Sequence, residues 1–64
     1  MDSRDEVPRF LTVRQFARAL GISVVLAYRL ISDGQIEHLR VGVAGGLIRI
    51  PESEVDRYLR ENEQ

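Results

Sequence analysis

The chain has 64 residues, a formal net charge of −1 and no cysteine. A domain of this length buries only about 60% of the surface that its unfolded chain exposes, so we expect one domain of modest stability. Because cysteine is absent, disulfides and thiolate metal sites are excluded. The acidic segment 1–6 lacks the apolar run of a signal peptide, and no stretch approaches the roughly 20 apolar residues that span a bilayer. The sequence therefore predicts a soluble, cytoplasmic protein that does not associate with membranes.

Charge is distributed unevenly along the chain. Residues 9–50 hold six arginines against Asp33 and Glu37, a net charge of +4, whereas residues 1–8 and 51–64 are both acidic. Affinity for polyanions comes from positive charge. The central segment, rather than the whole chain, is therefore the part that suits an anionic partner.

A first helix is predicted after a charged N-terminal segment, residues 1–9, which we expect to be a mobile arm. Thr12 is a good N-cap, and Gln15 completes a capping-box pattern. Apolar residues follow at helical spacing up to Leu20, and Gly21 is expected to end the helix in the left-handed conformation.

A second helix is predicted directly after this turn, over residues 24–33, with Ser23 as its N-cap and Gly34 just beyond its end. Its inner side carries Ala27, Leu30 and Ile31. The residues on the outer side are Val25, Tyr28, Arg29 and Ser32, with Val24 and Leu26 on the flanks. A helix that only covers a core would carry charged or amide side chains there, so the outward valine and tyrosine call for another explanation.

From His38 onward the apolar period changes to two residues. Segments 38–41 and 47–50 are predicted to form a two-stranded β-hairpin around the glycine-rich loop 42–46. The residues expected to face the helices are Leu39, Val41, Ile48 and Ile50. Arg40 and Arg49 would then share the outer side as cross-strand neighbours.

Pro51 is predicted to mark the start of a short third helix. Val55, Tyr58 and Leu59 would form its inward stripe. Residues 61–64 are expected to be a frayed tail, which leaves residues 10–60 as the folded domain.

The order of these elements resembles the excisionase family of small DNA-binding proteins, which share a MerR-like winged helix-turn-helix domain. The matching stretches are Leu11-Thr12-Val13 with Ala17, Leu20-Gly21-Ile22-Ser23, Ala27-Tyr28-Arg29-Leu30-Ile31 with Gly34, Leu39-Arg40-Val41-Gly42, and Arg49-Ile50-Pro51 with Val55 and Leu59. The resemblance implies an α+β fold that is mainly α, and double-stranded DNA as the ligand. The second helix, residues 24–32, would enter the major groove, and the wing would contact the adjacent minor groove or backbone.

Members of this family serve as recombination directionality factors that cooperate with an integrase, or as small transcription regulators. The sequence does not separate these two roles. Because a single small domain with few cationic contacts seldom reaches high specificity, we also expect head-to-tail self-association on repeated DNA sites.

Two features depart from the family pattern. Val24-Val25-Leu26 replaces the polar or basic residues that usually follow the serine cap, and the wing turn Val43-Ala44-Gly45-Gly46 is uncharged. The apolar triplet has three interpretations: contacts with thymine methyl groups in an A·T-leaning site, contacts with a protein, or a broader core face. A rival hypothesis is therefore a protein-interaction module that has lost DNA binding.

Ten residues are expected at the DNA interface: Arg14, Arg18, Ser23, Val24, Val25, Tyr28, Arg29, Ser32, Arg40 and Arg49. Arg29 is the first candidate for a guanine or phosphate contact, and its alternative role is an ion pair with Asp33. Tyr28 is expected either to bind a phosphate or to pack at the core edge. Arg40 and Arg49 would be destabilising as neighbours unless an anion lay between them.

No catalytic site, metal or cofactor is expected. A nucleophile requires a base and an orienting partner, and the chain has a single histidine, His38, and no cysteine. The glycine-rich segment 42–46 joins two strands instead of opening a helix, so it does not resemble a phosphate-binding loop.

Overall fold

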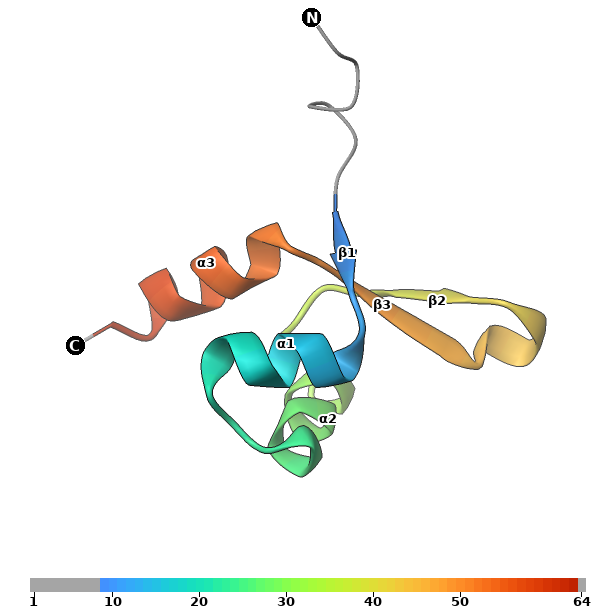
Figure 1. The fold of residues 1–64 in the computed structure, drawn as a ribbon, viewed down its shortest axis with the longest axis horizontal. Coiled ribbons are helices and arrows are strands. Elements are labelled where there is room, and N and C mark those ends of the chain that lie inside the picture. The colour runs from blue at the N-terminus through green and yellow to red at the C-terminus, as the bar shows by residue number, and fades with distance from the viewer. Residues whose placement is uncertain (1–8, 64) are drawn as a thin grey trace, which may run out of the picture.

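The computed structural model describes residues 9–63. Its elements in chain order are β1 (Phe10–Leu11), α1 (Val13–Leu20), α2 (Val24–Ser32), β2 (Leu39–Val41), the short 3-10 turn η2 (Val43–Gly45), β3 (Leu47–Pro51) and α3 (Ser53–Glu61). The β2–β3 hairpin projects to one side of α1 and α2, and α3 projects to the other (Figure 1). None of the helices in this part of the chain is long and apolar enough to cross a membrane.

The predicted capping box begins α1. The Thr12 hydroxyl accepts a hydrogen bond from the Gln15 amide at 3.0 Å, and the Gln15 side chain accepts one from the Thr12 amide at 2.9 Å. Gly21 ends the helix at φ +73°, and the amide of Ile22 donates to the Ala17 carbonyl at 3.0 Å. These bonds satisfy backbone groups that a helix leaves unpaired at its ends.

Helix α2 is also capped at both ends. The Ser23 hydroxyl accepts from the Leu26 amide at 3.0 Å. Beyond the C-terminus, Gly34 has a φ of +79°, and the amide of Gln35 donates to the Leu30 carbonyl at 3.0 Å. The helix and its two caps therefore agree with the sequence prediction.

The sheet has three antiparallel strands in the order β1-β3-β2, not the two predicted. Leu11 pairs with Ile50 and Phe10 with Pro51. The Glu52 amide also donates to the Arg9 carbonyl at 2.7 Å, so the pairing continues past the strand ends. A two-residue strand has no alternating pattern of its own, so no pattern in the sequence marks it.

The core lies where α1, α2 and the base of the hairpin meet. Its fully buried large side chains are Phe16, Ile36 and Ile50. Ile36 lies in the loop between α2 and β2, where no periodic pattern marked it. Leu11, Ile48, Val55 and Tyr58 pack against this cluster.

Leu39 and Val41 do not face the helices, contrary to the prediction. Leu39 stands opposite Arg49 and Val41 opposite Leu47, whereas Arg40 stands opposite Ile48. Directly opposed residues of an antiparallel pair share one face. Because Ile48 is on the core face, Leu39 and Val41 lie on the other face, where they are 49% and 39% exposed.

The third helix begins later than predicted. Pro51 is the last residue of β3, and α3 starts at Ser53. Leu59, predicted to point inward, is half exposed, whereas Glu54 on another side of the helix is buried.

The folded part of the chain extends slightly further toward the C-terminus than predicted. Glu61, expected in a frayed tail, is the last residue of α3, and the Asn62 side chain donates to the Tyr58 carbonyl. Most of the predicted N-terminal arm, residues 1–8, and the final Gln64 lie outside the described residues.

Candidate nucleic-acid interface

The outer face of α2 is as exposed as its periodicity predicts. Val25 is 75% exposed and Tyr28 49%, and Arg29 and Ser32 are exposed beside them. On the inner face, the buried residues are Ala27, Leu30 and Ile31. The helix thus offers a mixed apolar and polar stripe to a partner.

The triplet at the start of α2 is not part of the core. Val24, Val25 and Leu26 are 38%, 75% and 41% exposed, and none of them belongs to the buried core cluster. The interpretation of a broader core face is therefore wrong, and contacts with DNA or with a protein remain. Ser23 lies beside the triplet, with its hydroxyl oxygen engaged in the helix cap.

Three of the ten predicted residues line one groove. It lies between the start of α1, the middle of α2 and strand β3, and its walls include Arg14, Tyr28 and Arg49. Tyr28 lines this groove from α2 and is half exposed. Two guanidinium groups and a phenol along one concavity suit an anionic chain such as a phosphate backbone.

Arg40 and Arg49 are not cross-strand neighbours, contrary to the prediction. Arg40 is opposite Ile48 and Arg49 is opposite Leu39, so the two arginines lie on opposite faces of the hairpin. Arg49 is half-buried and donates through Nη1 to the Ile48 carbonyl at 2.9 Å. Because the two charges do not share a face, their mutual repulsion gives no argument for an anion between them.

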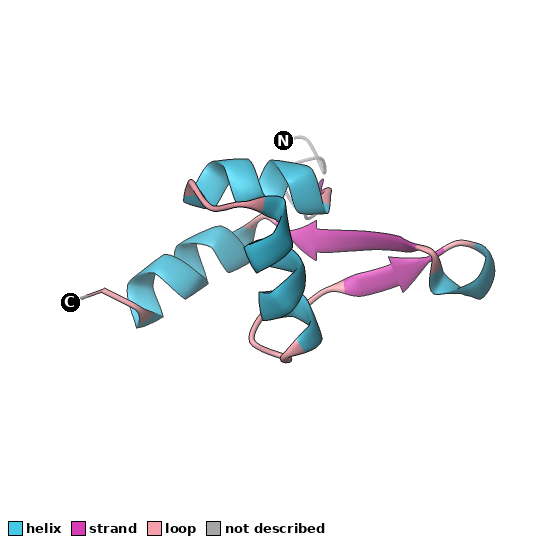
Figure 2. Cartoon of the chain, turned by 90° about the horizontal axis from the view of Figure 1, so that it is seen from below, coloured by secondary structure: helices cyan, strands magenta, loops and turns pink. Residues whose placement is uncertain are grey.

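The hairpin extends beyond the helices (Figure 2), and its tip carries no charged side chain. Val43 at the tip is 95% exposed. Arg40 lies close to the turn, since a Cβ added at Gly45 would be 3.4 Å from the Arg40 Cβ. The positive charge of the wing thus lies along its strands.

The remaining arginines of the predicted interface are free of ion pairs within residues 9–63. In that range the ion pairs are those of Arg57 with Glu54 and Glu61. Arg29 therefore does not pair with Asp33, although the i,i+4 spacing would allow it. Arg14 and Arg18 are both exposed on α1. Within residues 9–63, none of these three guanidinium groups is held by a carboxylate.

A buried carboxylate holds the segment that leads into the wing. Glu54 is 5% exposed, and its Oε1 accepts from the Glu37 amide at 2.9 Å. Arg57 donates to both oxygens of Glu54, at 2.7 and 2.9 Å, and to the Gln35 carbonyl at 2.8 Å. These bonds fasten α3 to the loop between α2 and β2, and we call them the Glu54 clamp.

The charges of the Glu54 clamp stabilise each other. The hydrogen bond from Arg57, aided by that from the Glu37 amide, holds the pKa of Glu54 below its usual value, although burial acts in the opposite direction. Glu54 in turn raises the pKa of Arg57. No local sequence pattern marks this cluster, because its backbone partners in loop 35–37 are distant in sequence. Its one local signal is the i,i+3 spacing of Glu54 and Arg57.

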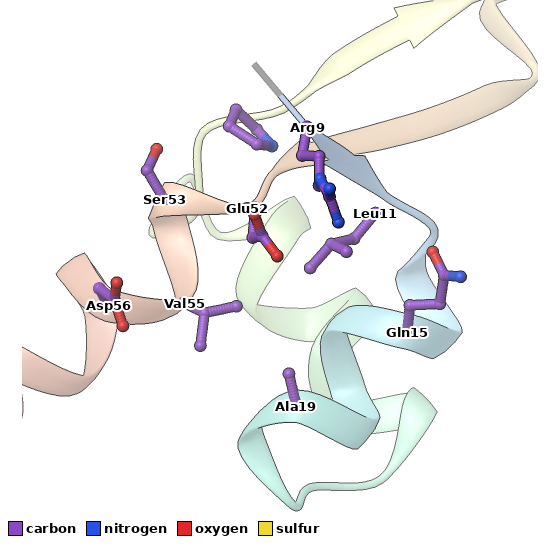
Figure 3. A pocket seen from close by; sticks show the side chains of 9 residues that line it. Arg9, Leu11, Gln15, Ala19, Glu52, Ser53, Val55 and Asp56 are labelled. Carbon is purple, nitrogen blue, oxygen red and sulfur yellow. The ribbon is translucent and has the colours of Figure 1, made fainter. Parts of the chain in front are cut away.

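A second groove contains none of the ten predicted residues. It lies between α1, β1 and the start of α3 (Figure 3). Its polar lining is mixed in charge, with Arg9 and Gln15 on one side and Glu52 and Asp56 on the other. The two carboxylates would repel phosphate, so this groove does not suit a DNA backbone.

His38 has a structural role. It is half-buried, and its Nδ1 donates to the Ile36 carbonyl at 3.0 Å. Between residues 9 and 63, no three histidine or carboxylate side chains gather as a metal site would require.

Two helices joined by a tight turn, followed by a hairpin, form a winged helix-turn-helix, which is a class of DNA-binding domain. Residues 10–63 match the family model described as a helix-turn-helix domain, and the chain belongs to that family. It is also 40% identical over 48 residues to a probable excisionase of Saccharopolyspora erythraea. These residues are 75% of this chain and 46% of that protein, so the chain spans about half the length of this relative. No solved structure matches. The resemblance to excisionase-type helix-turn-helix proteins is thus confirmed.

Proposed function

We propose that the chain binds double-stranded DNA sequence-specifically, as an excisionase-type recombination directionality factor without enzymatic activity. Helix α2 enters the major groove, and the β2–β3 hairpin contacts the adjacent backbone or minor groove. The observation that carries the proposal is the exposed face of α2, which adjoins a groove lined by Arg14, Tyr28 and Arg49. The 40% identity to a probable excisionase supports the role in recombination.

The dimensions of α2 suit this role. An α-helix with its side chains is about 10–12 Å in diameter, and the major groove of B-DNA, about 12 Å wide, admits it. In the proposed complex Arg29 and Ser32 reach base edges from α2, while Arg14 and Arg18 contact phosphates beside the groove. Arg40 and Arg49 contact the backbone from opposite faces of the wing.

The first experiment measures binding of the full chain to a duplex of random sequence and to DNA from around its own gene, at low salt. We expect weak binding to the former and a sequence-specific complex with the latter. Arg29→Ala should abolish the specific complex, while Arg60→Ala, an exposed arginine on α3, should leave it unchanged. Absence of any DNA binding at low salt would contradict the proposal.

Self-association along DNA is the second part of the proposal. The described part of the chain is electrically asymmetric, because residues 51–63 hold five carboxylates against Arg57 and Arg60, a net charge of −3, while the arginines of the interface lie on α1, α2 and the hairpin. When protomers bind repeated sites head to tail, an acidic end of one comes near a basic face of the next. Titration of duplexes with one and two copies of a site tests this, and equal affinity per site on both duplexes would contradict cooperativity.

A small transcription regulator of the same fold is the alternative role. It would use the same DNA interface, so the difference lies in the partner. A duplex carrying the two attachment sites, with the cognate integrase, separates the roles: stimulation of excision supports the recombination role, and repression of a nearby promoter without stimulation supports the regulator.

The rival function is a protein-interaction module that has lost DNA binding. Two observations favour it: Val24 and Leu26 are exposed beside Val25, and the tip of the wing is uncharged. An integrase or repressor would then bind the start of α2. The low-salt DNA titration separates this function from the proposed one.

A further inference from the structure

Val25 lies at the place where a recognition helix meets the bases. It is the second residue of α2, and the N-terminal residues of a recognition helix contact base edges. At 75% exposure its side chain has almost no contact with the rest of the domain. On the helical wheel it lies directly opposite the buried Ala27, Leu30 and Ile31, with Arg29 beside it.

A single exposed valine is ordinary on a protein surface. Val25 differs in two ways. Its nearest neighbours on the exposed face of α2 are polar or cationic, and Val24 and Leu26 extend the apolar area at the two edges of that face. Once α2 enters a groove, this side chain must lie against the floor of the groove or leave a gap there.

The major groove presents one apolar group, the C5 methyl of thymine. The edges of guanine, adenine and cytosine present donors and acceptors, and an isopropyl group would take these from water without offering a hydrogen bond. A valine at this position therefore favours a thymine and disfavours the other bases.

We propose that Val25 contacts the methyl group of a thymine, so that the DNA site has a thymine under the first turn of α2. This inference rests on the proposed function, since it requires α2 to lie in the major groove. Val25 and Arg29 lie on one face of α2, and this face adjoins the cationic groove. This arrangement favours DNA over a protein as the partner of Val25.

The position of Arg29 adds an expectation about the neighbouring bases. Arg29 lies four residues further along α2, about 6 Å, which corresponds to about two base-pair steps. Arginine reads guanine through O6 and N7. The selected sites should therefore pair the thymine with a guanine about two steps away.

The test starts from a randomised duplex pool, from which the full chain selects its preferred site. In the selected duplex each thymine is then replaced in turn by deoxyuridine, which removes the methyl and leaves every hydrogen-bonding group unchanged. We expect one position at which the replacement weakens binding about fourfold, the change that corresponds to roughly 0.8 kcal/mol for one buried methyl-sized group.

A double-mutant cycle identifies the side chain that meets this methyl. In Val25→Ala the same deoxyuridine should have no further effect, because the contact is already gone. The matched control is Val43→Ala, which truncates an exposed valine at the tip of the wing and should retain the full fourfold loss. Because Val25 is mostly exposed, both variants should unfold at nearly the same temperature as the parent protein.

A second replacement checks the chemistry with a different base. Changing the critical thymine·adenine pair to cytosine·guanine should weaken binding, and 5-methylcytosine at that position should recover part of the loss in the parent protein and none of it in Val25→Ala.

The outcomes separate this inference from the function on which it rests. If no duplex is bound specifically, the proposed function fails. If a specific site is selected but deoxyuridine is silent at every position, or acts equally in Val25→Ala, the function stands and the thymine contact is overturned.

Discussion

Arg40 and Arg49 lie on opposite faces of the wing, although they are only one position out of register across the hairpin. Arg40 is opposite Ile48 and Arg49 is opposite Leu39. Since side chains alternate between faces along a strand, a shift of one position determines whether the two charges repel each other or act independently.

We therefore predict that the effects of Arg40→Ala and Arg49→Ala are additive. Each should weaken DNA binding, and the double variant should equal the sum of the two within about 0.5 kcal/mol. If the two like charges were neighbours, removing one of them would raise the unfolding temperature. Because they lie on opposite faces, neither single variant should raise it. Binding titrations and thermal unfolding check this; a stabilised Arg40→Ala protein would contradict the observed register.

Removing the carboxylate of the Glu54 clamp should destabilise the fold. In Glu54→Ala the part-buried Glu37 amide and the Arg57 guanidinium both lose an acceptor, and the loss of such bonds costs about 1–3 kcal/mol. For a domain of this size that corresponds to a fall in Tm of roughly 4–8 °C for each kcal/mol.

The control is Glu61→Ala, which removes the other carboxylate bound to Arg57. Its side chain is 61% exposed, so its loss should change stability by less than about 1 kcal/mol. If the two substitutions lowered the unfolding temperature equally, the burial of Glu54 would make no contribution to stability.

The Glu54 clamp also predicts how stability depends on pH. The folded-state pKa of Glu54 lies below its ordinary value of 4.5, so its contribution is fully present above that pH and is lost as the pH falls toward the folded value. Urea unfolding between pH 7 and pH 3 should show a decline that begins near pH 4.5. In Glu54→Gln this component should be absent, and an unchanged decline would assign the acid sensitivity to other carboxylates.

Arg14→Ala should change the salt dependence of DNA binding more than its sequence preference. A phosphate contact contributes about 0.9 to the slope of log K against log salt for B-DNA. The slope should fall by about that amount in Arg14→Ala, with similar losses on specific and random duplexes. Arg60→Ala on α3 should leave the slope unchanged, so a reduced slope in that variant would place the DNA on a different surface.

The sequence predicted the helix-turn-helix well because its signals are local. The Thr12–Gln15 box, the Ser23 cap and the two glycines at 21 and 34 each act within a few residues of the chain, and the structure has all of them. The exposed face of α2 followed from the same periodicity.

The wing and the third helix were predicted less well because their partners are distant in sequence. The pairing of Leu11 with Ile50 and the bond from the Glu37 amide to Glu54 join segments that no local pattern connects. The wrong orientation of Leu39 has a related cause: an apolar alternation indicates a strand but not which of two apolar faces meets the core. Ile48 and Ile50 meet it, while Leu39, Val41 and Leu47 are exposed on the other face. Of the ten interface residues, the structure brings Arg14, Tyr28 and Arg49 to one groove.

Helix α2 is capped at both ends, and its buried residues are Ala27, Leu30 and Ile31. Substitutions at the exposed positions 25, 28, 29 and 32 should therefore cost little in folding. A library randomised at these four positions should consist mostly of folded proteins, which makes this small domain a practical starting scaffold for engineering new DNA specificities.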